Sequence, residues 1–373
     1  MLNPNKNLYR EFPDLPTTPH ARGRGSQINP GNRFEDIRLH VLGEERDRLA
    51  TENPDGVQLA TQVFDDDTKS IINPVDSPDL GFSWTINPYR GCEHGCIYCY
   101  ARPGHEYLGL SSGLDFETKV FAKRGAPELL RHALSKPSWT GETIVLSGVT
   151  DPYQPIERDL EITRGCLRVM AEFKQSVAVI TKSKLVLRDL DLLSTLRAVG
   201  AVRVAVSLTT LDHTVAHAME PRASSPKARL QTIRELAGAG IPVTVMAAPI
   251  VPNINDHEIP AILRAAADAG ATSAGYILLR LPHQIKAIFL EWVERHYPGR
   301  AAHVETLIRQ TQDGVLYDSA WFARQRGQGA FADQIRATFK VFSRRFGLDR
   351  PNRALNTAAF ARPQSDLGQL RLF

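Results

Sequence analysis

The sequence has 373 residues, of which 42% are hydrophobic and 23% charged, and these are ordinary values for a globular protein. A chain of this length can bury a large core and form one main domain with extensions, or two domains. No apolar run approaches the roughly 18–20 residues of a membrane helix, which excludes a protein anchored by such a helix. The net charge of +4 is a mild bias and does not by itself indicate nucleic-acid binding.

Residues 1–80 are predicted to form an irregular N-terminal extension. They are rich in Pro, Asn, Gly and charge, as in GRGSQINPGNRFE and FDDDTKS, with one helical candidate near Glu35 to Asn53. Such a composition favours a segment that wraps the body of the protein and is partly disordered. The first residues, MLNPNKNLYREFPDLP, are polar and broken by prolines, unlike a secretory signal, so we expect a soluble, cytoplasmic protein.

Residues 81–282 are predicted to form an α/β core, because short apolar runs alternate there with segments of helical spacing. The six predicted strands are Ser83–Tyr89, Thr143–Val149, Val177–Ser183, Val202–Thr209, Val243–Ile250 and Ala274–Arg280. These β-branched runs are typical of a parallel sheet that is buried on both faces and has right-handed crossovers. Six units are too few for an eight-stranded barrel, so we expect an open, partial barrel or a doubly wound sheet.

Polar, glycine and proline residues follow every predicted strand, where parallel α/β folds gather their functional groups. The first strand leads into a cysteine-rich stretch and the second into TDPYQPIE. The later strands lead into TKSK, SLTTLD, PIVPNIND and RLPHQ. The sequence therefore predicts a functional site at the carboxyl ends of the six strands.

Residues 283–373 are predicted to be mostly helical and basic. QIKAIFLEWVERHY and FADQIRATFKVFSRRFG have helical spacing, and residues 281–373 hold 14 Lys and Arg side chains against 8 Asp and Glu. The favoured interpretation is a helical cap over the open side of the barrel, with its arginines in water. Trp321, Phe322, Arg324 and Arg326 could also offer stacking and phosphate contacts to a nucleic acid, and the two interpretations are compatible.

Three of the four cysteines lie in NPYRGCEHGCIYCYA, directly after the first strand. Crowded cysteines in a chain of this size indicate metal or redox chemistry rather than a disulfide framework. Cys92, Cys96 and Cys99 have the spacing CxxxCxxC, and thiolates in one tight loop can hold three irons of a [4Fe–4S] cluster. The fourth iron would then be free to bind another ligand. Gly91 and Gly95 give the loop the backbone freedom to turn its sulfurs inward.

Two other interpretations of the cysteine stretch stay open on spacing alone. A structural zinc site, as in a zinc-stabilised nucleic-acid-binding module, normally takes four ligands in paired CxxC spacing, and no second pair exists here. His94 could be the fourth ligand only with strain, because it sits between two of the thiolates. An iron–sulfur electron-transfer protein would want Cys166, which lies in a helical pattern typical of a buried apolar thiol. An open cluster is therefore favoured.

The cysteine motif and its place in the chain resemble the radical SAM superfamily. The resemblance rests on CxxxCxxC with the aromatic Tyr98 before the last cysteine, after the first strand of a βα series, and it covers about Ser83 to Arg280. It implies a partial (β/α)6 TIM-like barrel in which the three cysteines hold a [4Fe–4S] cluster that binds S-adenosylmethionine (SAM). It also implies an external low-potential electron donor, of the flavodoxin or ferredoxin type, and radical chemistry on a substrate.

More narrowly, the strand ends are similar to those of the DNA repair photolyase-like branch, which includes spore photoproduct lyase. The SAM contacts implied are Tyr98 along the adenine, Thr150 and Asp151 at the methionyl end, Lys182 at the carboxylate and Ser207 on the ribose side. Plainer alternatives exist: Asp151 can start a turn, Lys182 can be a solvated lysine, and Ser207 can be a half-buried strand residue. Their occurrence together at successive strand ends favours the cofactor contacts.

The sequence departs from spore photoproduct lyase at the hydrogen donor. The resemblance places a cysteine beside the contacts of the second strand, where this chain has Gly148 and Val149. Reversal of thymine dimers by that route is therefore not expected. Tyr153 and Tyr100 are alternative hydrogen donors, and either could equally be a packing residue.

The resemblance alone implies that the substrate is a nucleic acid or contains a nucleotide. Glu220 and Arg222, after the fourth strand, could shape the site or form an ordinary surface ion pair. We expect a monomer that binds one cluster and one SAM and has no membrane partner.

Overall fold

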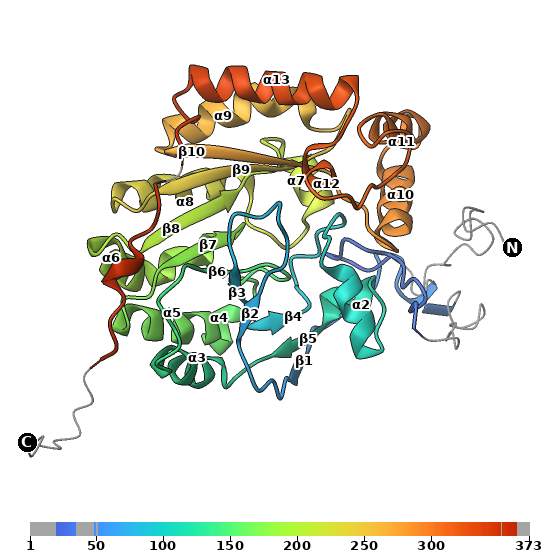
Figure 1. Cartoon of the computed structure of the whole chain (residues 1–373). Helices are drawn as coiled ribbons and strands as arrows, with labels where there is room; N and C mark the ends of the chain where they lie inside the picture. Colours follow the sequence, from blue (N-terminus) through green and yellow to red (C-terminus); the bar gives the residue numbers. More distant parts are fainter. Residues whose placement is uncertain (1–19, 35–47, 50, 352, 364–373) are drawn as a thin grey trace, which may run out of the picture.

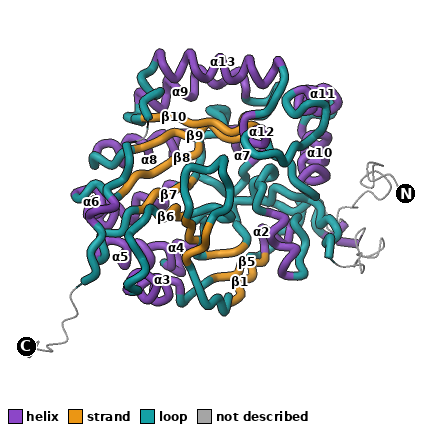
Figure 2. The backbone as a smooth tube through the Cα atoms, in the orientation of Figure 1, coloured by secondary structure: helices purple, strands orange, loops and turns teal. Residues whose placement is uncertain are grey.

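The computed structural model describes residues 20–34, 48, 49, 51–351 and 353–363 (Figure 1). Strands form its centre and helices lie around them (Figure 2). The main sheet has seven strands in the order β10-β9-β8-β7-β6-β3-β2. These strands are β2 (Ile72–Pro74), β3 (Trp84–Ile86), β6 (Ile144–Leu146), β7 (Val177–Thr181), β8 (Val202–Ser207), β9 (Val243–Ile250) and β10 (Ser273–Leu278).

All six predicted strands are present, and they pair in the order in which they occur along the chain. Neighbours from β3 to β10 are parallel, whereas β2 is an antiparallel edge strand against β3. A doubly wound sheet reverses its strand order at a switch point, but here each strand adds to the same side of the one before. The fold is therefore the partial barrel, and the doubly wound alternative is wrong.

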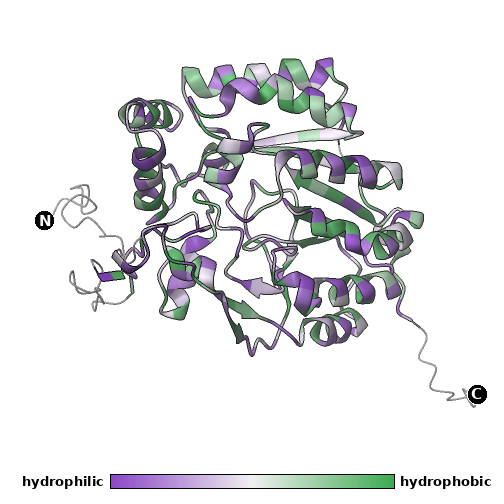
Figure 3. Cartoon of the chain, turned by 180° about the vertical axis from the view of Figure 1, so that it is seen from behind, coloured by the Kyte–Doolittle hydropathy of each residue, from purple (hydrophilic) through white to green (hydrophobic). Residues whose placement is uncertain are grey.

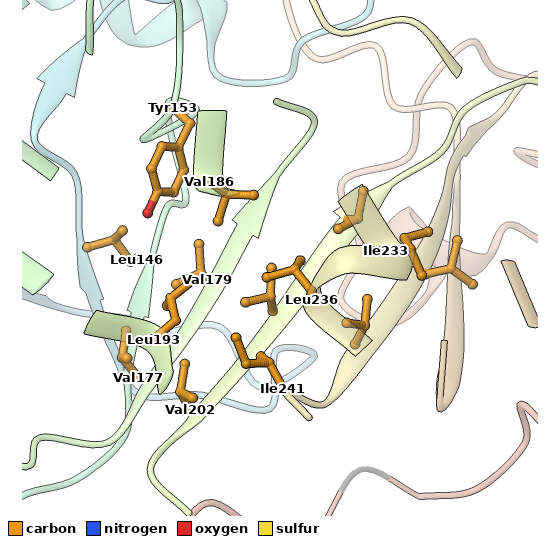
Figure 4. Close-up of a cluster of buried hydrophobic side chains, with 14 of the residues drawn as sticks. Leu146, Tyr153, Val177, Val179, Val186, Leu193, Val202, Ile233, Leu236 and Ile241 are labelled. Atoms are coloured by element: carbon orange, nitrogen blue, oxygen red, sulfur yellow. The ribbon is translucent and has the colours of Figure 1, made fainter. Parts of the chain in front are cut away.

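The central strands form because their β-branched residues pack well when both faces of the sheet are buried. In β8, Val202, Val204 and Val206 are at most 1% exposed, and they alternate with less buried residues. Figure 4 shows part of this core, in which Val202 belongs to one apolar cluster with Leu193, from the helix after β7, and Leu236, from the helix after β8. The helix faces with 3.6-residue spacing thus meet the outer face of the parallel strands.

Helices connect the strands and form the outer layer of the barrel (Figure 3). The larger ones of this layer are α3 (Ala126–Ser135), α5 (Ile162–Glu172), α6 (Leu190–Ala198), α8 (Pro226–Gly238) and α9 (Ile259–Asp268). Shorter elements at strand ends are α2 (Leu114–Thr118), α4 (Glu157–Leu160), α7 (His213–Met219) and the 3-10 helices η1 (Arg102–Leu108), η2 (Lys184–Asp189) and η3 (Asp256–Glu258). The Asp212 carboxylate caps α7 by accepting from two backbone N–H groups, and Ser225 caps α8 ahead of its first-turn proline.

A second, three-stranded sheet lies beside the barrel and was not predicted. It has the order β1-β5-β4, with β1 at Gln62–Asp65, β4 at Tyr89–Arg90 and β5 at Lys119–Ala122. β1 pairs in parallel with β5, and β4 pairs with β5 in the antiparallel sense. This sheet carries the chain from the end of β3 into the cysteine-rich loop. The first 80 residues thus supply two strands, β1 and β2, as well as irregular segments.

The segment 20–34 lies against the cysteine-rich loop, as a wrapping extension would. Arg24, Ser26, Gln27 and Ile28 are all at most 5% exposed. A methyl group at Gly25 would come within 1.8 Å of the Gly95 carbonyl oxygen, so the two backbones are in direct contact. Most of the helical candidate near Glu35 to Asn53 lies outside the described residues.

The C-terminal region is helical, as predicted, and covers two parts of the barrel. It contains α10 (Ile285–His296), α11 (Ala301–Gln310), α12 (Ala323–Arg326), α13 (Ala330–Arg345) and the 3-10 helix η4 (Thr357–Ala359). α13 packs on α9 and on β10, at the end of the sheet (Figure 1). α10 belongs to a separate apolar cluster with Cys96, Ile97 and Tyr98. In the described part of the chain, no helix has the length and apolar character to cross a membrane.

Replacing Gly25 by Ala should loosen the segment 20–34 from the cysteine-rich loop, because the added methyl group has no space against Gly95. We expect the free energy of unfolding in urea to fall by about 1–3 kcal/mol. Gly81→Ala is the matched control, since a methyl group there meets no atom within 4 Å. Equal stability of the two variants would contradict this packing.

Candidate functional site

The three clustered cysteines lie in the loop between β4 and η1, at the carboxyl edge of the parallel strands. Cys92 and Cys96 are 7% and 6% exposed, and Cys99 is half-buried. Cys92 and Cys99 pack together with Ala101 and Phe116, and burial together with the neighbouring thiols raises the pKa of Cys92. The loop therefore brings the three sulfur atoms toward one another.

The predicted glycine turns occur where the loop needs them. Gly91 has a φ of 80° and Gly95 a φ of 67°, a backbone conformation that residues with a β-carbon rarely adopt. A β-carbon at Gly91 would also meet Phe116 and Lys119 carbonyl oxygens at 3.0 and 3.1 Å. Both glycines are therefore required by the path of the loop around the sulfurs.

The loop is held to its neighbours by hydrogen bonds at both ends. The Cys92 N–H donates to the Phe116 carbonyl at 2.9 Å, and the Thr150 hydroxyl donates to the Gly91 carbonyl at 2.9 Å. The Gln154 side chain accepts from the Glu93 N–H at 2.9 Å and donates to Gly91 at 3.3 Å. The start of the loop is thus fixed to the turn that follows β6.

A buried ion pair fixes the other end of the loop. Arg102 and Glu117 are both 0% exposed, and their side chains meet at 2.5 Å. Arg102 also donates to the Cys96 carbonyl at 2.9 Å, while Glu117 accepts from the Gly25 and Ser26 N–H groups at 2.9 and 2.8 Å. One pair of charges therefore joins the loop, η1, α2 and the N-terminal segment.

The described residues provide no fourth thiol or imidazole for the three cysteines. Cys166 is fully buried in α5 within the main core, as its helical pattern indicated. The Nδ1 atom of His94 lies 3.4 Å from the Asp151 carboxylate instead of joining the thiols. No three His, Cys, Asp or Glu side chains of the described chain are arranged around a single metal ion. A [4Fe–4S] cluster does not need three ligands around one metal ion, because each thiolate binds a different iron of the cluster.

The thiols are of the kind that a cluster would use. Burial raises the pKa of the Cys96 thiol to about 12, with Lys182 opposing this change, and burial also raises the pKa of Cys92 well above its ordinary value. Iron binding would replace these protons with metal–sulfur bonds and compensate the buried negative charge. Two buried thiols and one half-buried thiol on one loop, with no fourth thiol beside them in the described chain, thus fit a cluster that leaves one iron open.

Thr150 and Asp151 lie beside the loop, but their side chains mainly bind protein groups. The Asp151 carboxylate accepts from the Thr181 hydroxyl at 2.7 Å, the Lys182 N–H at 2.9 Å and the Tyr153 N–H at 2.9 Å. Burial acts to raise the pKa of Asp151, but the neighbouring His94 and these hydrogen bonds outweigh it, so the pKa is lowered. Asp151 is therefore an ionised anchor that joins the ends of β6 and β7.

Tyr98 and Lys182 meet in a buried network centred on Glu220. The Tyr98 hydroxyl donates to Glu220, and the Lys182 ammonium group lies 3.1 Å from the Tyr98 oxygen and 3.4 Å from the Glu220 carboxylate. Glu220 also accepts from Thr209 at 2.8 Å and pairs with Arg229. The ends of β7 and β8 are thereby linked to the cysteine-rich loop.

The opposite charges in this network keep each other ionised despite their burial. Burial acts to raise the pKa of Glu220, but Arg229 and Lys182 outweigh it and hold the pKa well below its ordinary range. Burial acts to lower the pKa of Lys182, but Tyr98, Cys96 and Glu220 hold it well above its ordinary value. Both side chains are therefore ionised, and the interpretation of Lys182 as a freely solvated lysine does not fit its surroundings.

Sequence reasoning missed how this network is built. Glu220 is fully buried and pairs with Arg229, so its interpretation as a surface partner of Arg222 is wrong. Arg222 instead lies 3.2 Å from the carboxylate of Glu93. The only sequence signal for Arg229 was its place one turn into a helix with apolar spacing, which does not distinguish a buried arginine from a surface one.

Ser207 lies at the end of β8 and is 9% exposed. Its carbonyl accepts from Arg229 at 3.2 Å, whereas its hydroxyl has no hydrogen-bond partner among the residues that the structure describes. The hydroxyl is therefore free for a ligand.

The two tyrosines considered as hydrogen donors differ in their surroundings. Tyr153 is fully buried in the core and donates to Asp189 at 3.0 Å, as Figure 4 illustrates for its place among apolar side chains. Tyr100 is 47% exposed and donates to the Gly148 carbonyl, beside the exposed Val149. Tyr153 is thus a packing residue, and Tyr100 faces the end of β6.

A cavity of about 660 Å³ lies at the opposite, amino edge of the strands. It is lined by residues at the starts of β8 and β10 and by the C-terminal tail. It lies away from the cysteines, and the chemistry of the cysteine loop does not involve it.

Known proteins resemble this chain in sequence. The family model described as the radical SAM superfamily matches residues 86–266. A protein of Mycobacterium bovis is 36% identical over 245 residues, which cover 65% of this chain and 72% of that protein. A protein of Methanocaldococcus jannaschii is 30% identical over 190 residues, or 51% of this chain and 68% of that protein. Both relatives are themselves described as uncharacterized.

A viral relative and a solved structure carry functional names. The radical SAM Nalpha-GlyT isomerase of Pseudomonas phage M6 is 29% identical over 173 residues, or 46% of this chain and 34% of that protein. Spore photoproduct lyase complexed with dinucleoside spore photoproduct has a TM-score of 0.56 at 17% identity, covering 85% of this chain and 86% of the lyase. At that identity the likeness to the lyase concerns the fold.

Replacing Glu220 by Gln should destabilise the protein, because Arg229 and Lys182 would lose their buried counter-charge. We expect a loss of about 3 kcal/mol in urea unfolding at pH 7. The folded-state pKa of Glu220 is lowered, so its stabilisation is present above the ordinary glutamate pKa and is lost as the pH falls toward the folded value. The difference from wild type should therefore shrink in acid.

Glu305→Gln is the matched control, because Glu305 pairs with Arg309 on a partly exposed helix face and should contribute at most about 1 kcal/mol. A stability difference for Glu220→Gln that equals the control, or that does not change with pH, would contradict the network.

Proposed function

This chain belongs to the radical SAM superfamily, with a [4Fe–4S] cluster and SAM as its cofactors, and from that premise we propose that it is an enzyme that cleaves SAM reductively. When bound and reduced, the cluster supplies an electron that splits SAM into methionine and a 5′-deoxyadenosyl radical, which removes hydrogen from the substrate. The observation that carries the proposal is the set of three mutually close cysteines at the carboxyl edge, two buried and one half-buried, with no fourth thiol beside them among the described residues.

Cys92, Cys96 and Cys99 would hold the cluster, and the remaining chain keeps their loop in place. Arg102 fixes the Cys96 carbonyl, and Thr150 fixes the Gly91 carbonyl, so the loop stays ordered when its sulfurs bind iron. The apolar side chains packed around the loop limit the access of water to Cys92 and Cys96. This burial suits a cluster that must remain chemically protected while one position accepts SAM.

The SAM contacts divide into binding groups and positioning groups. Lys182 would pair with the SAM carboxylate, since its ammonium group is held charged in the site and keeps 16% of its side chain exposed. Ser207 would offer its free hydroxyl to the ribose side, and Tyr98 would lie along the adenine. Thr150 and Asp151 act at the methionyl end chiefly by fixing the backbone there, since their side chains bind protein groups.

The substrate class in this proposal is nucleotide-containing. The fold is shared with a lyase solved in complex with a dinucleoside spore photoproduct, which supports the class by analogy of fold. The absence of a cysteine between Thr143 and Asp151 separates this chain from the reaction of that lyase. The reductant is an external flavodoxin- or ferredoxin-type donor, and a monomeric, cytoplasmic enzyme remains the prediction from the sequence.

The test is the formation of 5′-deoxyadenosine after anaerobic reconstitution with iron and sulfide, reduction and addition of SAM. Wild type should form the product, and Cys96→Ala should form none because one iron loses its ligand. Cys166→Ala is the matched control, since Cys166 is buried in α5 away from the loop, and this variant should retain product formation. A brown wild-type protein that leaves SAM intact would indicate an electron carrier, and a colourless protein with zinc would indicate a structural site.

Replacing Lys182 by Met should raise the KM for SAM by about tenfold or more, since one charge-assisted contact is lost. Iron content per chain should be retained, because Lys182 is not a cluster ligand in this proposal. Lys184→Met is the control, as Lys184 is exposed two residues further along and should leave the KM unchanged. An unchanged KM in Lys182→Met would remove the assignment of Lys182.

A further inference from the structure

Four residues form a surface at the carboxyl edge, which we call the aromatic–arginine surface: the exposed rings of Tyr100, Trp321 and Phe322 and the partly buried Arg280. Tyr100, Trp321 and Phe322 are 47%, 48% and 63% exposed, which is high for such large apolar rings. Tyr100 follows the last cysteine of the loop, Arg280 follows β10, and the other two residues precede α12, which packs on β10 (Figure 1). The surface therefore borders the site of the cysteines.

Arg280 lacks an anionic partner. Its guanidinium lies 4.9 Å from the centre of the Tyr100 ring, and its Nε atom is buried without an acceptor. No carboxylate of the described chain pairs with it, in contrast to the neighbouring Arg324, which makes two contacts with Asp79 at 2.5 and 2.7 Å. A partly buried cation without a counter-charge is unfavourable unless a ligand supplies one. Arg280 is thus suited to receive an anion from outside the chain.

Trp321 and Phe322 are held exposed by the N-terminal region. The Phe322 N–H donates to the Asp79 carboxylate at 3.4 Å, and Arg324, held by the same carboxylate, stacks 4.3 Å from the centre of the Trp321 ring. Phe322 has a φ of 66°, a strained conformation for a bulky residue. The described contacts thus hold this turn while leaving both rings largely uncovered.

Two carboxylates beside this surface are paired with cations of the chain. Asp79 is neutralised by Arg324, and Glu220 by Arg229 and Lys182. Among the described residues of this surface, Arg280 is therefore the cation that a phosphate would meet without a competing carboxylate, and it lies on the Tyr100 ring.

We propose that the aromatic–arginine surface binds a single-stranded stretch of nucleic acid, with a base stacked on the exposed rings and an adjacent phosphodiester on Arg280. The inference deepens the proposed function and rests on it for the identity of the reacting site. Exposed aromatic faces recognise bases only when these are unstacked, so a single strand or an extruded base fits and an intact duplex does not. This chemistry is shared by DNA and RNA.

Binding of fluorescein-labelled octanucleotides to the reconstituted, SAM-bound protein tests the proposal by anaerobic fluorescence anisotropy. The arms are a deoxy octamer, a ribo octamer of the same sequence and the corresponding DNA duplex. We expect the single strands to bind at least about tenfold more tightly than the duplex. The relative affinity of the two single strands distinguishes DNA from RNA.

Arg280→Gln and Trp321→Ala should each weaken single-strand binding by about tenfold, and Arg280→Gln should lower the salt dependence by roughly one phosphate contact. Trp321→Phe should restore most of the affinity, because stacking needs only a flat ring. Arg344→Gln and Val341→Ala, exposed on α13 away from this edge, are matched controls and should bind like wild type. Iron content per chain checks that each variant is folded.

The two proposals fail separately. Wild type that forms 5′-deoxyadenosine but binds the duplex as well as the single strands, or whose Arg280 and Trp321 variants match the controls, overturns the inference and leaves the proposed function standing. Wild type that forms no 5′-deoxyadenosine overturns the proposed function, whatever the anisotropy shows.

Discussion

The buried ion pair between Arg102 and Glu117 is the constraint on which the candidate site depends. Two unexposed charges are tolerated only if each finds its partner and further hydrogen bonds. Here the additional bonds go to the Cys96 carbonyl and to the Gly25 and Ser26 N–H groups. The charge compensation of one pair thus determines how the cysteine-rich loop turns and where the N-terminal segment lies. The loop geometry is consequently a property of several distant segments.

A second group of buried charges holds the cysteine-rich loop in place on its other side. Glu220 joins Arg229, Lys182 and Tyr98, so residues from β7, β8 and the loop share one set of compensating charges. Many polar groups at this edge therefore position one another before any ligand arrives, which favours a rigid, pre-organised site. Arg280 and the Ser207 hydroxyl differ, because the described chain gives them no hydrogen-bond or ion-pair partner, and ligand contacts are best sought there.

Much of the barrel and the cysteine loop could be predicted because their signals are local. The valine-rich runs of β7 to β9 have few alternatives to a buried parallel strand, and CxxxCxxC with its two glycines has few alternatives to a metal-binding turn. The short strands β1, β4 and β5 were missed because two to four residues carry no clear periodicity and form only by pairing across the chain. Glu220 was misjudged for the same reason, since its partner Arg229 is known only once the chain is folded.

The sequence by itself determined the number and order of the parallel strands, the three clustered thiols and the helical C-terminal region, because each depends on hydrophobic periodicity or close spacing. Only the tertiary structure decided that Asp151 and Thr150 bind protein groups, that Arg324 is engaged by Asp79, and that Arg280 has no carboxylate partner among the described residues. The physical reason is that the role of a polar side chain depends on which partner neutralises it. Those partners are brought together by folding from segments as far apart as Asp79 and Arg324.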